Sequence, residues 1–264
     1  MQERHLNRET YFNELSQTAR EYYLDYIRQV REIRPGDRIL EVGCGEGGNL
    51  LPFAELGCRV TGIDRLEERV GQAAAFFAKH GYDGRFVAAD FMGYVPMEGE
   101  QYELVLIHDV IEHIPDKDGF VEHLLPLLAP QALVFWGFPA WQMPFGGHQQ
   151  MCHSKFCSHA PFLHLLPVPV YRSVLKAFHE RPGCIGEMLD IKQCRTSIER
   201  FERLCKKHGL KVLHRQLWFI NPHYKQKFRL TPRKLWAPLA HLPWLRNFFS
   251  TSCFYLTAVE KSGQ

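Results

Sequence analysis

The stretch that most limits the fold is ILEVGCGEGGN, residues 39–49, in which an apolar run leads directly into a glycine-rich segment. The apolar run predicts a buried strand, and the glycines predict a tight turn that opens a helix. Glycines let backbone N–H groups approach a ligand without a Cβ in the way. Nucleotide and phosphate sites share such turns, so this segment alone leaves several ligands open.

Strands and helices alternate after this turn. We expect strands at 38–43, 59–64, 84–90, 102–109 and 132–139, and helices at 49–57, 66–81 and 117–129. This alternation predicts an α/β fold with a doubly wound, mostly parallel sheet and helices on both faces.

The segments outside this pattern have different compositions. Helices are expected over 5–33, a short helix near 171–180, a helix at 197–209, and strands at 210–221 and 252–261. We interpret 1–264 as a single domain in which 1–35 forms a helical lid. Residues 140–196, rich in Pro, His, Cys and aromatic residues, would form an insertion that covers the substrate. Residues 222–250 would form a basic, aromatic insertion before the last strand.

Composition excludes some classes of protein. No apolar run reaches the roughly 18–20 residues that cross a bilayer, and the polar start MQERHLNRETYF does not resemble a signal peptide. We therefore expect a cytoplasmic protein whose eight cysteines are reduced thiols. A net charge of +3 does not favour nucleic acid as a partner.

Two acidic residues follow the next strands. Asp64 ends the second strand, about 20 residues after the turn, where an acid can bind the ribose hydroxyls of an adenosine-bearing ligand. Asp90 ends the third strand and precedes Phe91. Its carboxylate can accept from an adenine amino group while the aromatic ring covers the base.

The order EVGCGEGGN, GID, AADF and HDVIEHI resembles the class I S-adenosylmethionine-dependent methyltransferases over about residues 36–139. The resemblance implies S-adenosylmethionine as cofactor and a seven-stranded sheet with an antiparallel last strand. It places Glu41 near the methionine end of the cofactor. The predicted cofactor-binding residues are Glu41, Gly43, Cys44, Gly45, Asn49, Asp64, Arg65, Asp90, Phe91 and His108.

A cluster of possible metal ligands follows the fourth strand. Asp109, Glu112 and His113 share one face if the segment is helical, and His148 in a glycine-containing loop offers a fourth ligand. Such ligands suit Mg²⁺, Mn²⁺ or Zn²⁺. The motif is similar to those of ubiquinone-biosynthesis O-methyltransferases and of enzymes that methylate small-RNA 3′ ends, although Asp109 departs from their pattern. The alternative is that these residues only shape the pocket, with Asp116 capping the following helix.

The chemistry favours a hydroxyl acceptor, from which His148 or His113, with Asp109, would remove the proton. We expect a small-molecule, sugar or lipid-linked acceptor. Methylation of an RNA 3′ end or of another macromolecule, and an inactive cofactor-binding partner protein, are the alternatives.

Two segments remain open to several interpretations. Residues 222–250 suit an extra helical layer, RNA, or peripheral contact with the inner face of an anionic membrane. The spacing of Cys152, His153, Cys157 and His159 lacks the regularity of a zinc site and predicts loop residues.

Overall fold

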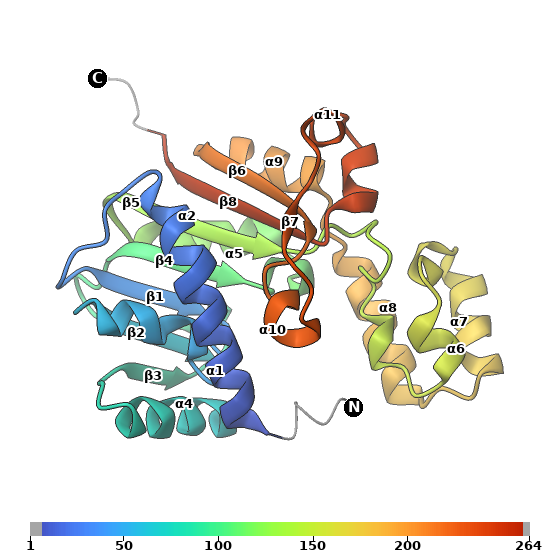
Figure 1. Ribbon diagram of the computed structural model, residues 1–264, viewed down its shortest axis with the longest axis horizontal. Helices are drawn as coiled ribbons and strands as arrows, with labels where there is room; N and C mark the ends of the chain where they lie inside the picture. Colours follow the sequence, from blue (N-terminus) through green and yellow to red (C-terminus); the bar gives the residue numbers. More distant parts are fainter. Residues whose placement is uncertain (1–6, 261–264) are drawn as a thin grey trace.

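The computed structural model describes residues 7–260 and is built around one sheet (Figure 1). The strands are β1 (Arg38–Val42), β2 (Arg59–Asp64), β3 (Arg85–Ala88), β4 (Tyr102–His108), β5 (Leu128–Phe138), β6 (Leu210–Ile220), β7 (Arg233–Lys234) and β8 (Ser252–Val259). Their order is β3-β2-β1-β4-β5-β8-β6-β7. Strands β1 to β5 are parallel, and β8 lies antiparallel between β5 and β6. The predicted seven strands are confirmed, and the two-residue β7 adds an edge.

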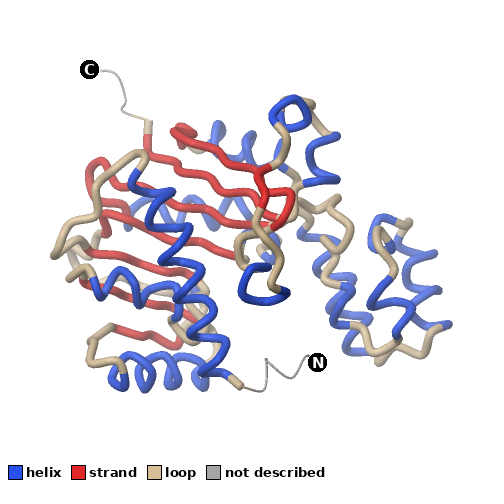
Figure 2. The backbone as a smooth tube through the Cα atoms, viewed as in Figure 1, coloured by secondary structure: helices blue, strands red, loops and turns tan. Residues whose placement is uncertain are grey.

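Helices cover both faces of the sheet (Figure 2). They are α1 (Arg8–Thr18), α2 (Leu24–Arg28), α3 (Leu51–Glu55), α4 (Glu67–Lys79), α5 (Lys117–Leu124), α6 (Lys155–His159), α7 (Val168–Ala177), α8 (Pro182–Cys194), α9 (Ile198–Lys207), α10 (Tyr224–Phe228) and α11 (Ala237–Ala240). One core joins the sheet to α1, α2, α3 and α4. The other joins it to α5 and α9.

Some boundaries differ from the sequence prediction. The helix expected over 117–129 ends at Leu124, and a 3-10 turn at Leu125–Leu127, containing Pro126, leads into β5. Helix α8 was missed, although a proline at the first helical position is a recognised start signal. Residues 5 and 6 of the expected first helix, and residue 261 of the expected last strand, lie outside the described residues.

Residues 141–191 form a small body with its own hydrophobic cluster, beside the carboxyl ends of the strands (Figure 1). We call helices α6 to α8 with their connecting loops the cap. All eight cysteines are free thiols, as predicted. None of the helices in residues 7–260 is long and apolar enough to cross a membrane.

Candidate active site

The glycine turn sits where the carboxyl ends of β1 and β2 meet. Gly43, Gly45 and Gly47 adopt φ of 72°, 52° and 79°, a conformation that residues with a Cβ rarely adopt. The space where a Cβ would sit on Gly45 is open, and its backbone N–H donates to the Asp64 carboxylate at 2.9 Å. The predicted neighbourhood of the turn and Asp64 is therefore present.

Two buried acceptors lie at the start of this turn. The Asn49 side-chain amide donates to Glu41 Oε1 at 2.7 Å. Burial raises the pKa of the Glu41 carboxyl to about 8. Glu41 Oε2 and Asn49 Oδ1 have no hydrogen-bond partner among the described residues. Because buried acceptors are normally satisfied, this pair fits an ammonium donor such as the amino group of a methionine moiety.

Helix α1 lies directly on the glycine turn. A Cβ on Gly48 would come within 2.5 Å of the Phe12 carbonyl oxygen and 2.8 Å of Leu15 Cβ. Arg8 also forms an ion pair of 2.9 Å with the buried Glu46. Helix α1 and the glycine turn are thus in contact.

His108 faces the N-terminal helices. Its Nε2 lies 2.8 Å from the Tyr23 hydroxyl, and its ring fills the space where a Cβ on Gly137 would be. The side chain is 5% exposed. This contact joins the N-terminal helices to β4, and a cofactor contact by His108 stays a prediction.

The third predicted contact involves Asp90 and Phe91 at the end of β3. Asp90 caps the turn Phe91–Gly93 by accepting from Met92 N–H at 3.0 Å. The Phe91 ring is buried against the rings of Phe120 and His123. A contact of Phe91 with an adenine stays a prediction.

A second cluster forms beyond β4. One ligand atom each from Glu112, His113 and His148 lie within 4.8 Å of one another. The His113 and His148 rings are 4.9 Å apart, although they come from different loops. The Val110 side chain lies 2.5 Å from the Cβ position of Gly43, so this segment adjoins the glycine turn.

The helical face that Asp109 was expected to share with Glu112 and His113 is not formed, and a role for Asp109 as a ligand stays a prediction. The helical spacing does not apply, because only Ile111–His113 form a 3-10 turn and Asp109 lies before it with φ of 53°. Asp109 is not part of the three-residue group. Burial lowers the pKa values of His113 and His148, and the negative charge of Asp109 is close enough to oppose this lowering. The alternative cap is confirmed: Asp116 accepts from Gly119 N–H at 3.0 Å.

Burial dominates the electrostatics of the second cluster. Both Glu112 carboxylate oxygens are buried without a hydrogen-bond partner among the described residues, and burial raises the pKa of this carboxyl well above its usual range. Burial lowers the pKa of His113 to about 4, with contributions from the nearby His148 and Arg65. The pKa of His148 is also lowered by burial. Both imidazoles are therefore neutral at neutral pH.

Tyrosines that the sequence did not single out lie close to this cluster. The charge of Asp109 contributes to raised pKa values of Tyr11 in α1 and Tyr224 in α10. Lys227 of α10 contributes to the lowered pKa of His148. Tyr224 and Lys227 of α10 are therefore close enough to interact electrostatically with Asp109 and His148. No motif signals this proximity, because α10 lies more than 70 residues after His148 in the chain.

Comparison with known proteins agrees with this geometry. A family model described as a methyltransferase domain matches residues 15–215, which include both the glycine turn and the second cluster. The chain belongs to this methyltransferase family. The predicted class I S-adenosylmethionine-dependent methyltransferase is thus confirmed at the level of family and fold.

The methyltransferase is similar to curated proteins over part of its length. It is 30% identical over 129 residues to a ubiquinone biosynthesis O-methyltransferase of Bartonella tribocorum, covering 44% of this chain and 51% of that protein. It is 33% identical over 115 residues to the Rhizobium leguminosarum bv. trifolii protein of the same name, covering 42% and 44%. The chain therefore matches about half the length of these relatives.

Solved structures share the fold of this methyltransferase. The magnesium protoporphyrin IX methyltransferase of Synechocystis PCC 6803 has a TM-score of 0.57 at 14% identity, covering 94% of this chain and 84% of that one. The plantazolicin methyltransferase has a TM-score of 0.54 at 15% identity, covering 97% and 87%.

Proposed function

We propose that this methyltransferase transfers a methyl group from S-adenosylmethionine to a hydroxyl oxygen of a small-molecule or lipid-linked acceptor. The observation that carries the proposal is the convergence of Glu112, His113 and His148 beside the glycine turn. This arrangement suits removal of a proton from a hydroxyl. The similarity to ubiquinone biosynthesis O-methyltransferases supports oxygen as the accepting atom.

Several residues fit the donor. When bound, S-adenosylmethionine supplies a methyl group activated by its sulfonium. Glu41 and Asn49 would bind its amino group, and Asp64 its ribose hydroxyls. The open space at Gly45 leaves room for a ligand against the backbone. Alignment of the acceptor oxygen with the methyl carbon would supply much of the rate, because methyl transfer is an in-line displacement.

The imidazoles of His113 and His148 would remove the proton from the hydroxyl group that is methylated. Because their pKa values are lowered, each has a free nitrogen lone pair at neutral pH. Neutral histidine can act as a general base. The carboxylate of Asp109 lies close enough to stabilise the imidazolium that forms. In this proposal Asp109 supports the base electrostatically.

The same three residues fit a divalent metal. Two imidazoles and one carboxylate are a common ligand set, and the unpartnered Glu112 carboxylate is the kind of buried group that a cation satisfies. A metal here would lower the pKa of a hydroxyl acceptor. His113 and His148 would then act as ligands and not as bases.

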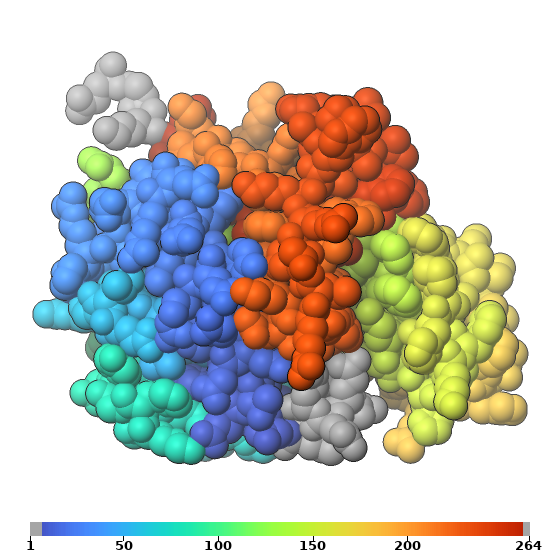
Figure 3. Space-filling model, in the orientation of Figure 1, coloured from blue at the N-terminus to red at the C-terminus, as the bar shows by residue number. Residues whose placement is uncertain are grey.

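Residues 222–250 support an amphipathic or membrane-associated acceptor. The exposed fractions of Trp236 and Trp244 are 73% and 54%, so the segment is more than an inward-packed layer. It contains no Asp or Glu, and its basic residues outside the core are Lys225, Lys227, Arg229, Arg233 and Lys234. Arg246 is buried and paired with Glu199 and Glu202. Exposed tryptophans with basic residues suit an anionic membrane surface. Figure 3 shows the orange part of this segment between the blue N-terminal helices and the yellow-green cap.

The proposal is tested by incubating the protein and S-adenosylmethionine with a metabolite and lipid extract, and searching by mass spectrometry for products heavier by one CH₂. Fragmentation should place the new methyl group on oxygen. His148→Ala should abolish the product, whereas His80→Ala, at an exposed histidine outside the second cluster and outside residues 222–250, should not. A methyl group on carbon or nitrogen would contradict the proposal.

A further inference from the structure

Two thiols of the cap lie together although they are far apart in the chain. Cys152 follows the 3-10 turn Gln149–Met151, and Cys184 lies in the first turn of α8. Their sulfur atoms are 4.0 Å apart across 32 residues of sequence. A Glu180 carboxylate oxygen completes a group in which all three ligand atoms lie within 4.8 Å of one another.

The spacing matches metal ligands better than a disulfide. Two sulfurs on one tetrahedral zinc ion, with Zn–S bonds of about 2.3 Å, are about 3.8 Å apart. The sulfurs of a disulfide are about 2.05 Å apart. The observed 4.0 Å is therefore close to the edge of a zinc coordination tetrahedron.

Glu180 is a buried carboxylate held in place at this group. Its two oxygens accept the backbone N–H groups of His153 at 2.9 Å and Ser154 at 2.8 Å. A carboxylate has about four acceptor positions, so both oxygens keep lone pairs for a metal. Glu180 forms no ion pair among the described residues, and a buried charge normally needs one.

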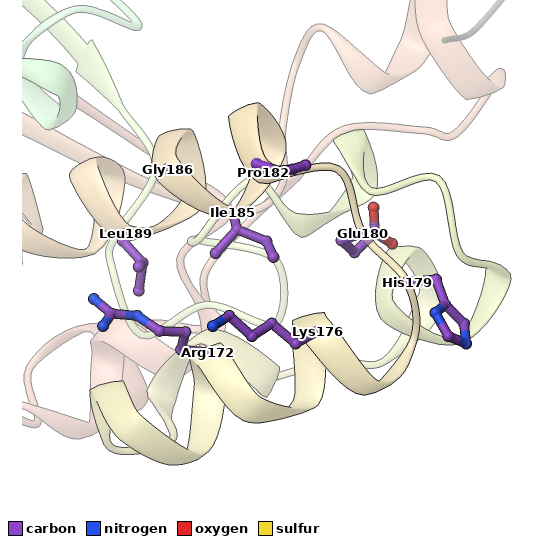
Figure 4. Close-up of a pocket in the computed structure, with 8 residues that line it drawn as sticks. All are labelled: Arg172, Lys176, His179, Glu180, Pro182, Ile185, Gly186 and Leu189. Carbon is purple, nitrogen blue, oxygen red and sulfur yellow. The ribbon is translucent and has the colours of Figure 1, made fainter.

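Two basic residues lie near this group. Arg172 and Lys176 line, together with Glu180, a cleft of about 630 Å³ between α7 and α8. Figure 4 shows these two side chains in the cleft, while the Glu180 carboxylate points away from them.

The cap is a small body that a metal would stabilise. Its hydrophobic cluster consists of few buried side chains, and α6 has only five residues. Bodies with so small a core commonly depend on a metal or disulfide. A cation bound here would join the loop after His148 to the start of α8.

We propose that Cys152, Cys184 and Glu180 bind a zinc ion that holds the cap together. Binding would release the two thiol protons as the sulfurs become thiolate ligands. The three ligand atoms leave the fourth position of a tetrahedral ion to water or to another side chain. This site is separate from Glu112, His113 and His148, and it does not depend on the identity of the acceptor.

The test is metal analysis of the full chain purified without chelators. About one zinc ion per chain is expected, as is typical of a structural site. Zinc should be retained in His113→Ala and in the control Cys58→Ser, and lost in Cys184→Ser. Cobalt added to the zinc-free, unmutated chain should give the intense thiolate-to-cobalt absorption.

Two results would overturn the proposal. The first is that the unmutated protein contains no zinc and gives no thiolate-to-cobalt absorption when cobalt is added. This measurement does not depend on whether Cys184→Ser folds. The second is zinc that persists in Cys184→Ser but disappears in His113→Ala, which would assign the ion to the second cluster.

Discussion

Replacing Glu41 with glutamine should make the protein more stable and, at the same time, weaken its binding of the methyl donor. The carboxyl has an ordinary pKa of 4.5 when unfolded and about 8 in the buried site. At pH values between 4.5 and about 8, the Glu41 carboxyl is deprotonated in the unfolded chain but still protonated in the folded chain. The free energy of unfolding therefore falls by about 1.4 kcal/mol per pH unit as pH rises through this window.

At pH 7 the pH lies 2.5 units above the unfolded pKa of 4.5. The buried carboxyl therefore lowers the free energy of unfolding at pH 7 by about 3 kcal/mol, which the uncharged amide of Glu41→Gln should restore. For a chain of this size this gives a rise in Tm of roughly 6–12 °C. Loss of a charged hydrogen bond to the donor's amino group, worth about 1.5–3 kcal/mol, should weaken donor binding about 10- to 100-fold.

Thermal unfolding of both proteins at pH 5, 6, 7 and 8 measures the first effect, and calorimetric titration with S-adenosylmethionine measures the second. The difference in Tm should grow from pH 5 to pH 8 and then stay constant. Glu98→Gln, at an exposed loop position, is the control and should change neither quantity. A Glu41→Gln protein that unfolds at or below the wild-type Tm at pH 8 would refute the reasoning.

Three further predictions concern the acceptor side. Because burial lowers the pKa of His113 to about 4, wild-type kcat should stay level from pH 8 down to pH 6; a fall centred near pH 6.5 would count against a buried base. If Glu112 shares a metal with the two imidazoles, EDTA should abolish turnover and Mn²⁺ or Zn²⁺ should restore it, whereas full activity in EDTA would leave the histidines as bases. Replacing both Trp236 and Trp244 with alanine should weaken cosedimentation with phosphatidylserine-containing vesicles about tenfold or more, and unchanged binding would remove the membrane role.

The sheet and the glycine turn were predictable because short, continuous sequence patterns indicate them. A buried strand that runs into glycines, followed by acids at the next strand ends, gives both the parallel topology and the contact of Gly45 with Asp64. The order of strands at the C-terminal edge came from the family resemblance. The two-residue β7 is too short to leave a pattern.

The acceptor side was less predictable because it depends on contacts between distant segments. The helical face expected for Asp109, Glu112 and His113 is not formed, because the chain makes a short 3-10 turn after a left-handed residue there. The spacing of Cys152 to its neighbours in sequence does not indicate a zinc site, because the thiol that donates to it, Cys184, lies 32 residues later in the chain. Tyr224 interacts electrostatically with Asp109 although the two residues lie more than 100 positions apart in the sequence.

The packing of α1 on Gly48 has a kinetic consequence. With the helix in place, the side of the turn at Gly48 is covered by backbone, so a bulky nucleoside cannot enter or leave from that side. If exchange takes this side, it requires the Arg8–Glu46 ion pair to open and the helix to swing outward. Donor exchange by this route would then be no faster than this opening motion.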